Sequence, residues 1–298
     1  MGRGKAQKTL DLIDAAHDIL AEIQPASVRA VSYQLFITGI IDSMSKANTN
    51  RVGTQLVYAR ESDIIPWGWI VDETREAERI SQWASPLEIF EAAARQYRYD
   101  YWSEQPERIE VWSEKGTVRG TLSPILRKYG VTLRVMHGHA SATAVNDAAE
   151  WSLDSDKPFT VLYVGDRDPS GMHMSEVDLP ERVMRYGGDI EFVRIAIAEQ
   201  DTLETADVPY FAAGDKRNDP RYRWYVDGYG SRCWELDALN PVTLRARVER
   251  HIREHLDLDA WRHAKGIEAA QRETTQKFVA GFAASISMPA TKCDGGAP

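Results

Sequence analysis

The sequence predicts a mixed α/β protein, with an N-terminal winged helix-turn-helix followed by a domain built on a parallel sheet. Two observations support this: a helix, turn, helix, strand order within the first 80 residues, and regular alternation of strands and helices after Pro106. Such alternation is typical of parallel sheets with helices on both faces. A chain of 298 residues is long enough for about two ordinary domains.

Helical patterns dominate the first 60 residues. Apolar side chains at helical spacing predict a helix over residues 7–23. Ser27 is a suitable N-cap for the next helix, and Gly39 is a suitable stop. After a polar turn, SKANTN, a further helix is expected over about 50–63. The run IIPWGWIVDE, rich in aromatic and β-branched residues, then predicts a pair of short strands, which would form the wing.

An amphipathic, charged helical pattern over residues 73–104 predicts a connecting segment. Beyond it, the expected strands are RIEVWSE, VTLRVMHG, FTVLYVGD and IEFVRIAIA. The expected helices are TVRGTLSPILRKYG, ATAVNDAAEWSL and a segment from about Asp178. These patterns divide the chain into an N-terminal helix (1–24), the winged helix-turn-helix domain (25–80), a helical connector (81–105), the α/β domain with its C-terminal extension (106–288) and a flexible tail (289–298).

Composition points to an ordinary globular protein, with 43% hydrophobic and 27% charged residues. The N-terminus lacks the apolar core of a secretory signal, and no apolar run could span a membrane, so we expect a cytoplasmic protein without a membrane partner, nucleoid-associated in a prokaryote. Cys233 and Cys293 are the two cysteines, and we expect neither a disulfide nor a cysteine-based zinc site. The net charge of −9 argues against a protein that coats nucleic acid through bulk charge.

Acidic residues follow two of the expected strands. Asp166 and Asp168 come directly after the apolar run FTVLYV, and Glu114 follows RIEVWS. Open α/β sheets bind ligands at the carboxyl ends of their strands, and carboxylates are ligands that Mg²⁺ prefers. The alternative for an isolated Asp-x-Asp is a solvated turn. Lys115 and Arg167 lie beside these acids in sequence and could offset part of their charge.

These motifs resemble a known family. Glu after a first strand and Asp-x-Asp after a third is similar to the Toprim pattern of topoisomerases, primases and some nucleases. More narrowly, WSEKG, DRDPSG, IEFVRIAIA and WELDAL, with Arg and Tyr spaced as in VRAVSYQL, resemble the type IIB topoisomerase VI A subunit and the meiotic double-strand-break transesterase. The resemblance covers residues from about 26 to 251 and implies a Toprim-type parallel α/β domain. The sequence departs from it at HGHASAT, where relatives often have a more Gly-rich turn.

The resemblance gives roles to individual residues. It implies that Tyr33 attacks a DNA phosphate and forms a 5′-phosphotyrosyl link, while Mg²⁺ or Mn²⁺ at Glu114, Asp166 and Asp168 stabilises the developing charge. Arg29 lies four residues before Tyr33, on the same helix face, and could hold a phosphate beside the phenol. Glu114 could instead transfer the tyrosyl proton. The alternative for Tyr33 is a half-buried packing residue.

Double-stranded DNA is the expected partner. The segment from Met44 to Arg60 has basic residues and no acidic one, so the acidic excess lies elsewhere. Its polar side chains are of the kind that contact phosphates and base edges, although a solvated surface helix would look the same. The expected DNA-binding residues are Lys46, Asn50, Arg51, Thr54, Gln55, Tyr58, Lys115 and Arg119. The stretch DKRNDPRYRWY interleaves Arg with aromatic residues and is a further basic candidate.

The family's tyrosine works with the metal of a second protomer, so the resemblance also implies a homodimer. The chain has no Gly-x-x-x-x-Gly-Lys nucleotide loop, so an ATPase B-type subunit would have to be a separate chain if strands are passed. Two other functions stay open: a Toprim nuclease that activates water, and a winged-helix DNA-binding protein without catalysis. Glu235 and Asp237 are expected to cap a helix, and His137 and His139 are too few for a zinc site.

Overall fold

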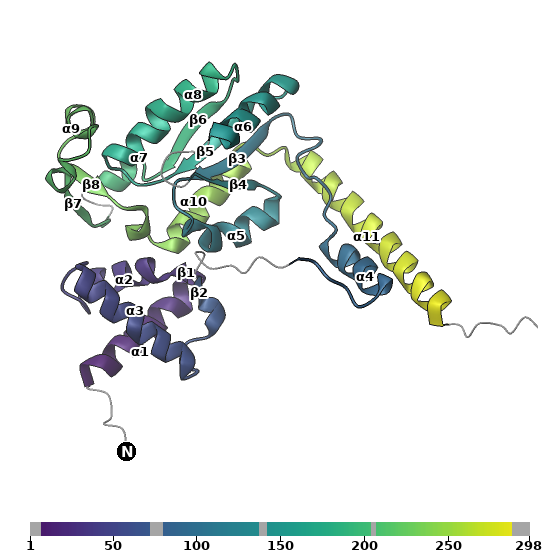
Figure 1. Ribbon diagram of the computed structural model, residues 1–298, viewed down its shortest axis with the longest axis horizontal. Helices are drawn as coiled ribbons and strands as arrows, with labels where there is room; N and C mark the ends of the chain where they lie inside the picture. The colour runs from purple at the N-terminus through teal and green to yellow at the C-terminus, as the bar shows by residue number, and fades with distance from the viewer. Residues whose placement is uncertain (1–6, 72–79, 137–141, 204–206, 288–298) are drawn as a thin grey trace, which may run out of the picture. The chain divides into compact units, whose positions relative to one another are not determined.

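The computed structural model describes residues 7–71, 80–136, 142–203 and 207–287. It is a mixed α/β structure with a parallel sheet, which confirms this part of the prediction (Figure 1). The chain divides into two units: residues 1–76 with 106–255, and residues 77–105 with 256–298. None of the helices in the described ranges is long and apolar enough to cross a bilayer.

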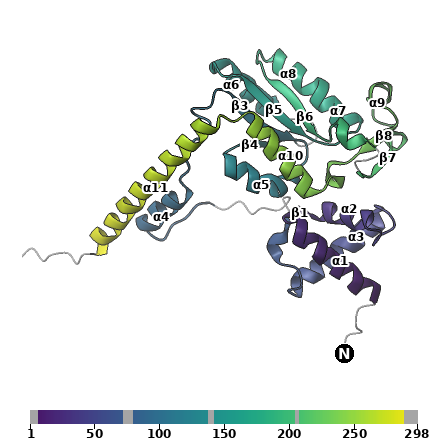
Figure 2. The ribbon, with the colours of Figure 1, turned by 180° about the vertical axis from the view of Figure 1, so that it is seen from behind.

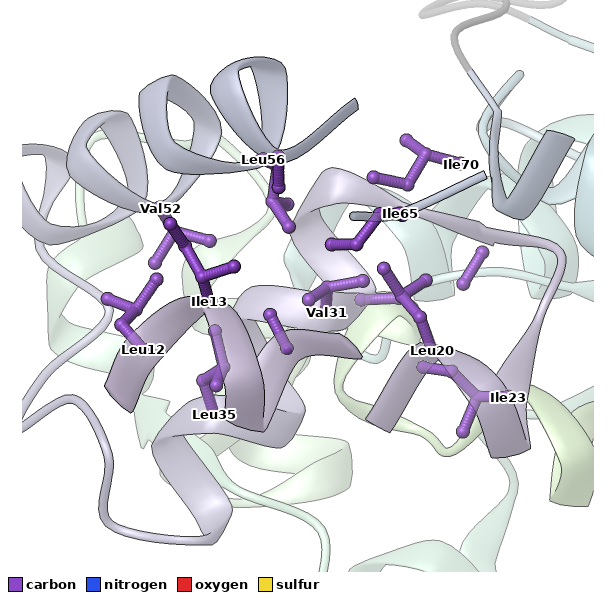
Figure 3. Close-up of a cluster of buried hydrophobic side chains, with 14 of the residues drawn as sticks. Leu12, Ile13, Leu20, Ile23, Val31, Leu35, Val52, Leu56, Ile65 and Ile70 are labelled. Atoms are coloured by element: carbon purple, nitrogen blue, oxygen red, sulfur yellow. The ribbon is translucent and has the colours of Figure 1, made fainter. Parts of the chain in front are cut away.

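Three helices at the start of the larger unit enclose one apolar core: α1 (Gln7–Ile23), α2 (Val28–Ile37) and α3 (Lys46–Glu61). The helical spacing of the apolar residues places one face of each helix inside. Figure 3 shows the buried side chains Leu12, Ile13, Leu20, Ile23, Val31, Leu35, Val52, Leu56, Ile65 and Ile70. Ser27 caps α2 by accepting a hydrogen bond from the Ala30 amide (3.1 Å), as the sequence predicts. After α2, Gly39 adopts a φ of +75°, a conformation that favours glycine.

Two expectations for this region are wrong. α3 begins at Lys46 rather than near Asn50, because Ser45 accepts a hydrogen bond from the Asn48 amide and caps the helix earlier. The run IIPWGWIVDE does not form a strand pair in its described part. It contains a 3₁₀ turn (Trp67–Trp69) and a two-residue strand β2 (Ile70–Val71), which pairs in parallel with β1 (Ala26–Ser27). The last two residues of the run lie outside the described residues.

The parallel sheet has the strand order β4-β3-β5-β6. Its strands are β3 (Arg108–Ser113), β4 (Thr132–Val135), β5 (Phe159–Val164) and β6 (Glu191–Ala196). Every residue of β5 is buried, as expected for an apolar central strand. Helices α6 (Ala142–Asp154) and α8 (Leu179–Arg185) cover one face, while α5 (Val118–Tyr129) and α10 (Pro241–Glu254) cover the other (Figures 1 and 2).

The helix after β5 begins earlier than the sequence predicts, at Pro169 rather than near Asp178. It starts as α7 (Pro169–His173) and continues through a π turn (Met174–Asp178) into α8. Asp168 is the N-cap, and proline suits the first helical position because its missing N–H has no partner there. The remaining elements are β7 (Tyr210–Ala212), α9 (Tyr222–Tyr229), β8 (Arg232–Trp234) and a 3₁₀ turn (Leu236–Ala238).

The smaller unit contains α4 (Pro86–Gln96) and the long helix α11 (Leu258–Ser287). Within the described part of residues 73–104, only α4 is helical, because Ser85 and Pro86 start a new helix. α4 packs on α11 through aromatic rings, with Phe90 edge-on to Phe278 and Phe282. The segment expected to be a connector is therefore paired with the C-terminal helix.

Candidate active site

The three expected metal ligands come together at one edge of the sheet. β3 and β5 are direct neighbours, with Ser113 opposite Val164 at their carboxyl ends. Glu114 follows β3 at once, and Asp166 and Asp168 lie in the loop after β5. A Cβ added to Gly171 would meet both the Glu114 side chain (3.2 Å) and the Asp166 carbonyl oxygen (2.3 Å). The parallel pairing that the sequence predicts thus brings distant acids into one cluster.

Burial and mutual repulsion set the charge of this cluster. Burial, together with the nearby Asp166 and Asp168 carboxylates, raises the pKa of Glu114 to about 7. Burial also raises the pKa of Asp166, although Lys115 and the Leu236 amide oppose that shift. A carboxylate with a pKa near 7 exchanges a proton easily at neutral pH, so Glu114 can hold either a proton or a cation.

Two lysines neutralise the aspartates. The Lys115 ammonium lies 2.8 Å from Asp166 Oδ1 and 3.0 Å from Asp237 Oδ2. Burial lowers the pKa of Lys115, but the surrounding Asp237 and Asp166 carboxylates outweigh this effect and raise it overall. The Lys216 ammonium lies 3.2 Å from Asp168 Oδ2. Lys115, a predicted DNA-binding residue, pairs with these carboxylates in the structure.

The loop that carries Asp166 and Asp168 is held tightly. The Asp168 side chain accepts a hydrogen bond from the Gly171 amide (2.8 Å), and the Leu236 amide donates to Asp166 Oδ1 (2.7 Å). The guanidinium of Arg194, on β6, donates to the Gly165 and Gly171 carbonyl oxygens, at 3.1 and 2.7 Å. Sequence reasoning missed Arg194, because nothing in IEFVRIAIA marks this residue as different from an exposed strand arginine.

The donor set is of the kind that a hard divalent cation prefers, because carboxylates from two neighbouring strand ends lie near one another. In the part of the chain that the structure describes, no group of three or more Asp, Glu, His or Cys side chains is arranged as a metal site. The observed pairing of Lys216 with Asp168 means that a cation would have to displace this lysine from the carboxylate. His137 and His139 lie outside the described residues.

Tyr33 and Arg29 lie together on α2, as their spacing predicts. The Arg29 guanidinium carbon is 5.7 Å from the centre of the Tyr33 ring. Tyr33 is only 6% exposed, and its hydroxyl is within hydrogen-bonding reach of the Glu235 carboxylate. Burial, with a further contribution from Glu235, raises the pKa of Tyr33. Tyr33 is therefore a neutral phenol in this structure.

Glu235 and Asp237 connect α2 to the acidic cluster, a role that sequence reasoning missed. Arg29 Nε donates to Glu235 Oε2 (2.6 Å), and the Ser27 hydroxyl donates to Asp237 Oδ1 (3.1 Å). The Glu235 side chain makes no helix-capping hydrogen bond, so the expectation of a capping pair is wrong. The segment lies here because Trp234 pairs with Arg167, next to Asp166. The sequence signal was an acidic pair in WELDAL, but its partners lie about 200 residues away in the chain.

The expected DNA-binding side chains of α3 are on its outer side. Val52, Leu56 and Ala59 face the core. The opposite side presents Lys46, Asn50, Arg51, Thr54 and Tyr58 as exposed residues and Gln55 as half-buried. Arg119, on α5, is also exposed. The outer side of α3 is thus largely polar and basic up to Arg60, and the exposed Glu61 at its end is its one acidic side chain.

Comparison with known proteins does not identify the chain. No protein-family model matches the sequence, and no curated protein is significantly similar to it.

Cys233 is buried, and burial raises the pKa of its thiol to about 11, which makes it an inert packing residue.

Proposed function

We propose that this chain is a DNA-cleaving transesterase that resembles the type IIB topoisomerase A subunit, with a winged-helix region and a Toprim-type domain. The observation that carries the proposal is that Tyr33 and Arg29 lie side by side on α2, while Glu114, Asp166 and Asp168 gather at the carboxyl ends of β3 and β5. A nucleophile, a phosphate-binding guanidinium and clustered carboxylates are the groups that this reaction needs.

The proposed reaction exchanges one phosphodiester for another. The Tyr33 oxygen attacks the phosphorus, the P–O3′ bond breaks, and the 3′ oxygen leaves as a hydroxyl after taking a proton. Arg29 holds the non-bridging oxygens through its forked N–H groups. The phenolic proton passes to a carboxylate, for which Glu114 is suited because its pKa is about 7. Mg²⁺ or Mn²⁺ held by Asp166 and Asp168, and by Glu114 when this residue holds no proton, would supply positive charge to the transferring phosphoryl group.

The assembly follows from the same proposal. By the resemblance, the tyrosine of one protomer works with the acidic cluster of another, so we propose a homodimer on double-stranded DNA. The exposed face of α3 is the proposed groove reader, since helix-turn-helix proteins place such a helix in the major groove. Passage of a second DNA strand would need an ATPase B-type partner in another chain.

One observation favours a second candidate, a Toprim nuclease in which the same carboxylates activate water. Tyr33 is buried, and its raised pKa makes it a poor nucleophile in this conformation. In that reaction Tyr33 would only pack α2 against its neighbours, and no covalent intermediate would form.

Incubation with supercoiled DNA and Mg²⁺ or Mn²⁺, followed by denaturant, distinguishes the two candidates. The transesterase predicts protein covalently attached to the cut ends, and loss of both cutting and attachment in Tyr33→Phe. Tyr186→Phe is the matched control, because Tyr186 lies beyond α8 and packs against the core away from the acids. Cutting by Tyr33→Phe at the wild-type rate, without attachment, would establish the nuclease.

A further inference from the structure

Glu235 holds both groups that the proposed reaction must free. Its carboxylate accepts a hydrogen bond from Arg29 Nε (2.6 Å) and also pairs with the terminal nitrogen of the same guanidinium. The Tyr33 hydroxyl lies within hydrogen-bonding reach of the same carboxylate. The Arg29 side chain is 44% exposed and that of Glu235 only 22%, so DNA can approach the guanidinium from the solvent side.

A DNA phosphate and the Glu235 carboxylate compete for the same donors. Glu235 occupies the edge of the guanidinium formed by Nε and Nη2, and that edge matches one planar carboxylate or one phosphate. A phosphate and a carboxylate that lie beside the same guanidinium also repel each other. Binding of a phosphate through this edge of Arg29 therefore requires the Glu235 side chain to turn away.

The backbone around Glu235 is fixed, which limits the movement to this side chain. The Leu236 amide donates to Asp166 (2.7 Å), and Asp237 is held by both Ser27 and Lys115. A partly exposed ion pair adds little stability, so a phosphate can displace it. The backbone beside Glu235 is thus fixed, and the Glu235 carboxylate is the anion next to α2 that a phosphate can replace.

We propose that Glu235 is a positioning residue that acts as an internal competitor of the DNA phosphate. Its carboxylate occupies the Nε–Nη2 edge of Arg29 in the free protein, beside Tyr33, and must be displaced before cleavage. This inference rests on the proposed function, because it assigns Arg29 to phosphate binding.

The test is DNA affinity without cleavage. Fluorescence anisotropy of a labelled duplex in EDTA, at low salt, compares wild type, Glu235→Gln, Arg29→Gln and the double variant. We expect Glu235→Gln to bind about two- to fivefold tighter, because it frees Arg29, and to give no gain when Arg29 is already Gln. Glu249→Gln is the matched control, since Glu249 also accepts hydrogen bonds from a cation, Lys128, and from a tyrosine hydroxyl, Tyr129, outside the site.

The outcomes separate this inference from the proposed function. Equal affinity of Glu235→Gln and wild type, or a gain that persists in the double variant, would overturn the competitor role. Tighter DNA binding by Glu235→Gln that depends on Arg29 supports the competitor role. This holds even if Tyr33 forms no covalent adduct, a result that would contradict only the proposed transesterase activity. If Glu235→Gln does not fold, as judged by thermal unfolding, Glu235→Ala serves as the second variant with the same expected result.

Discussion

At the residue scale, Glu114 controls the charge of the acidic cluster. Burial and the two neighbouring aspartates raise its pKa from 4.5 to about 7. Because the folded state binds the proton more tightly than the unfolded chain, Glu114 favours folding at low pH, and this contribution is lost as the pH rises from about 4.5 through 7. Above pH 7 the buried charge destabilises the fold.

Glu114→Gln removes that cost. Without metal, we expect the variant to be more stable than the wild type at pH 8 by on the order of 1–3 kcal/mol, with little difference at pH 5. Urea unfolding in EDTA at the two pH values measures this. Glu249→Gln is the control with the opposite sign, because Lys128 and Tyr129 lower the pKa of Glu249. A Glu114→Gln protein less stable than the wild type at pH 8 would contradict the account.

Gly171, on α7, lies against the Asp166 backbone and the Glu114 side chain, and a substitution there tests how tightly these groups pack. Gly171→Ala would place a Cβ 2.3 Å from the Asp166 carbonyl oxygen, and the backbone would have to shift. We expect a loss of about 1–3 kcal/mol in the free energy of unfolding, the usual cost of overpacking. Gly228→Ala, on α9, has no atom within 4 Å of the added Cβ and should be neutral or slightly stabilising in the same urea titration. Equal stability of the two variants would show that the loop tolerates the methyl group.

At the element scale, α3 is the surface that should meet DNA. Its exposed side includes Arg51, and its one acid is Glu61 at the C-terminal end. We expect Arg51→Gln to weaken duplex binding and to reduce the slope of log K against log salt by about 1, since one phosphate contact is lost. Arg95→Gln, on α4 of the smaller unit, removes the same charge and should leave the slope unchanged. An unchanged slope for Arg51→Gln would mean that α3 does not contact the backbone.

Elements with strong apolar periodicity are predictable from the sequence, whereas short elements and the exact starts of α3 and α7 are not. The apolar stripes of α1 and α2 and the fully apolar β5 leave one reasonable assignment. The aromatic run Trp67–Trp69 suggests a strand, but the backbone there forms a 3₁₀ turn. Two helix starts depend on N-caps that the apolar patterns do not reveal, because Ser45 and Asp168 start α3 and α7 earlier than those patterns indicate. A polar N-cap is easily taken for a loop, because the same residues favour both.

At the scale of the whole molecule, the strand order explains why part of the site was predictable. Glu114 and Asp166 each follow a strand, and a parallel sheet brings such ends together without further information. The pairing of Arg29 with Glu235 spans 206 residues and depends on how separate elements dock, so no local pattern reveals it. The contacts between α2 and the segment that carries Glu235 and Asp237 are therefore revealed only by the structure.

The net charge of −9 is compatible with a DNA substrate because the segment from Met44 to Arg60 carries none of the acids. Three of them form the cluster in which a divalent cation would offset their charge. DNA binding should consequently be modest, sensitive to salt and strengthened by Mg²⁺.

The most direct test of the central claim is to locate the covalent bond. After cleavage of DNA in Mn²⁺ and digestion with nuclease and trypsin, mass spectrometry should find a nucleotide on the peptide of residues 30–46, which has Tyr33 as its single tyrosine. The account predicts a 5′-linked phosphotyrosine at Tyr33, absent in Tyr33→Phe. Cut DNA with an unmodified peptide 30–46, or with an adduct on another residue, would contradict it.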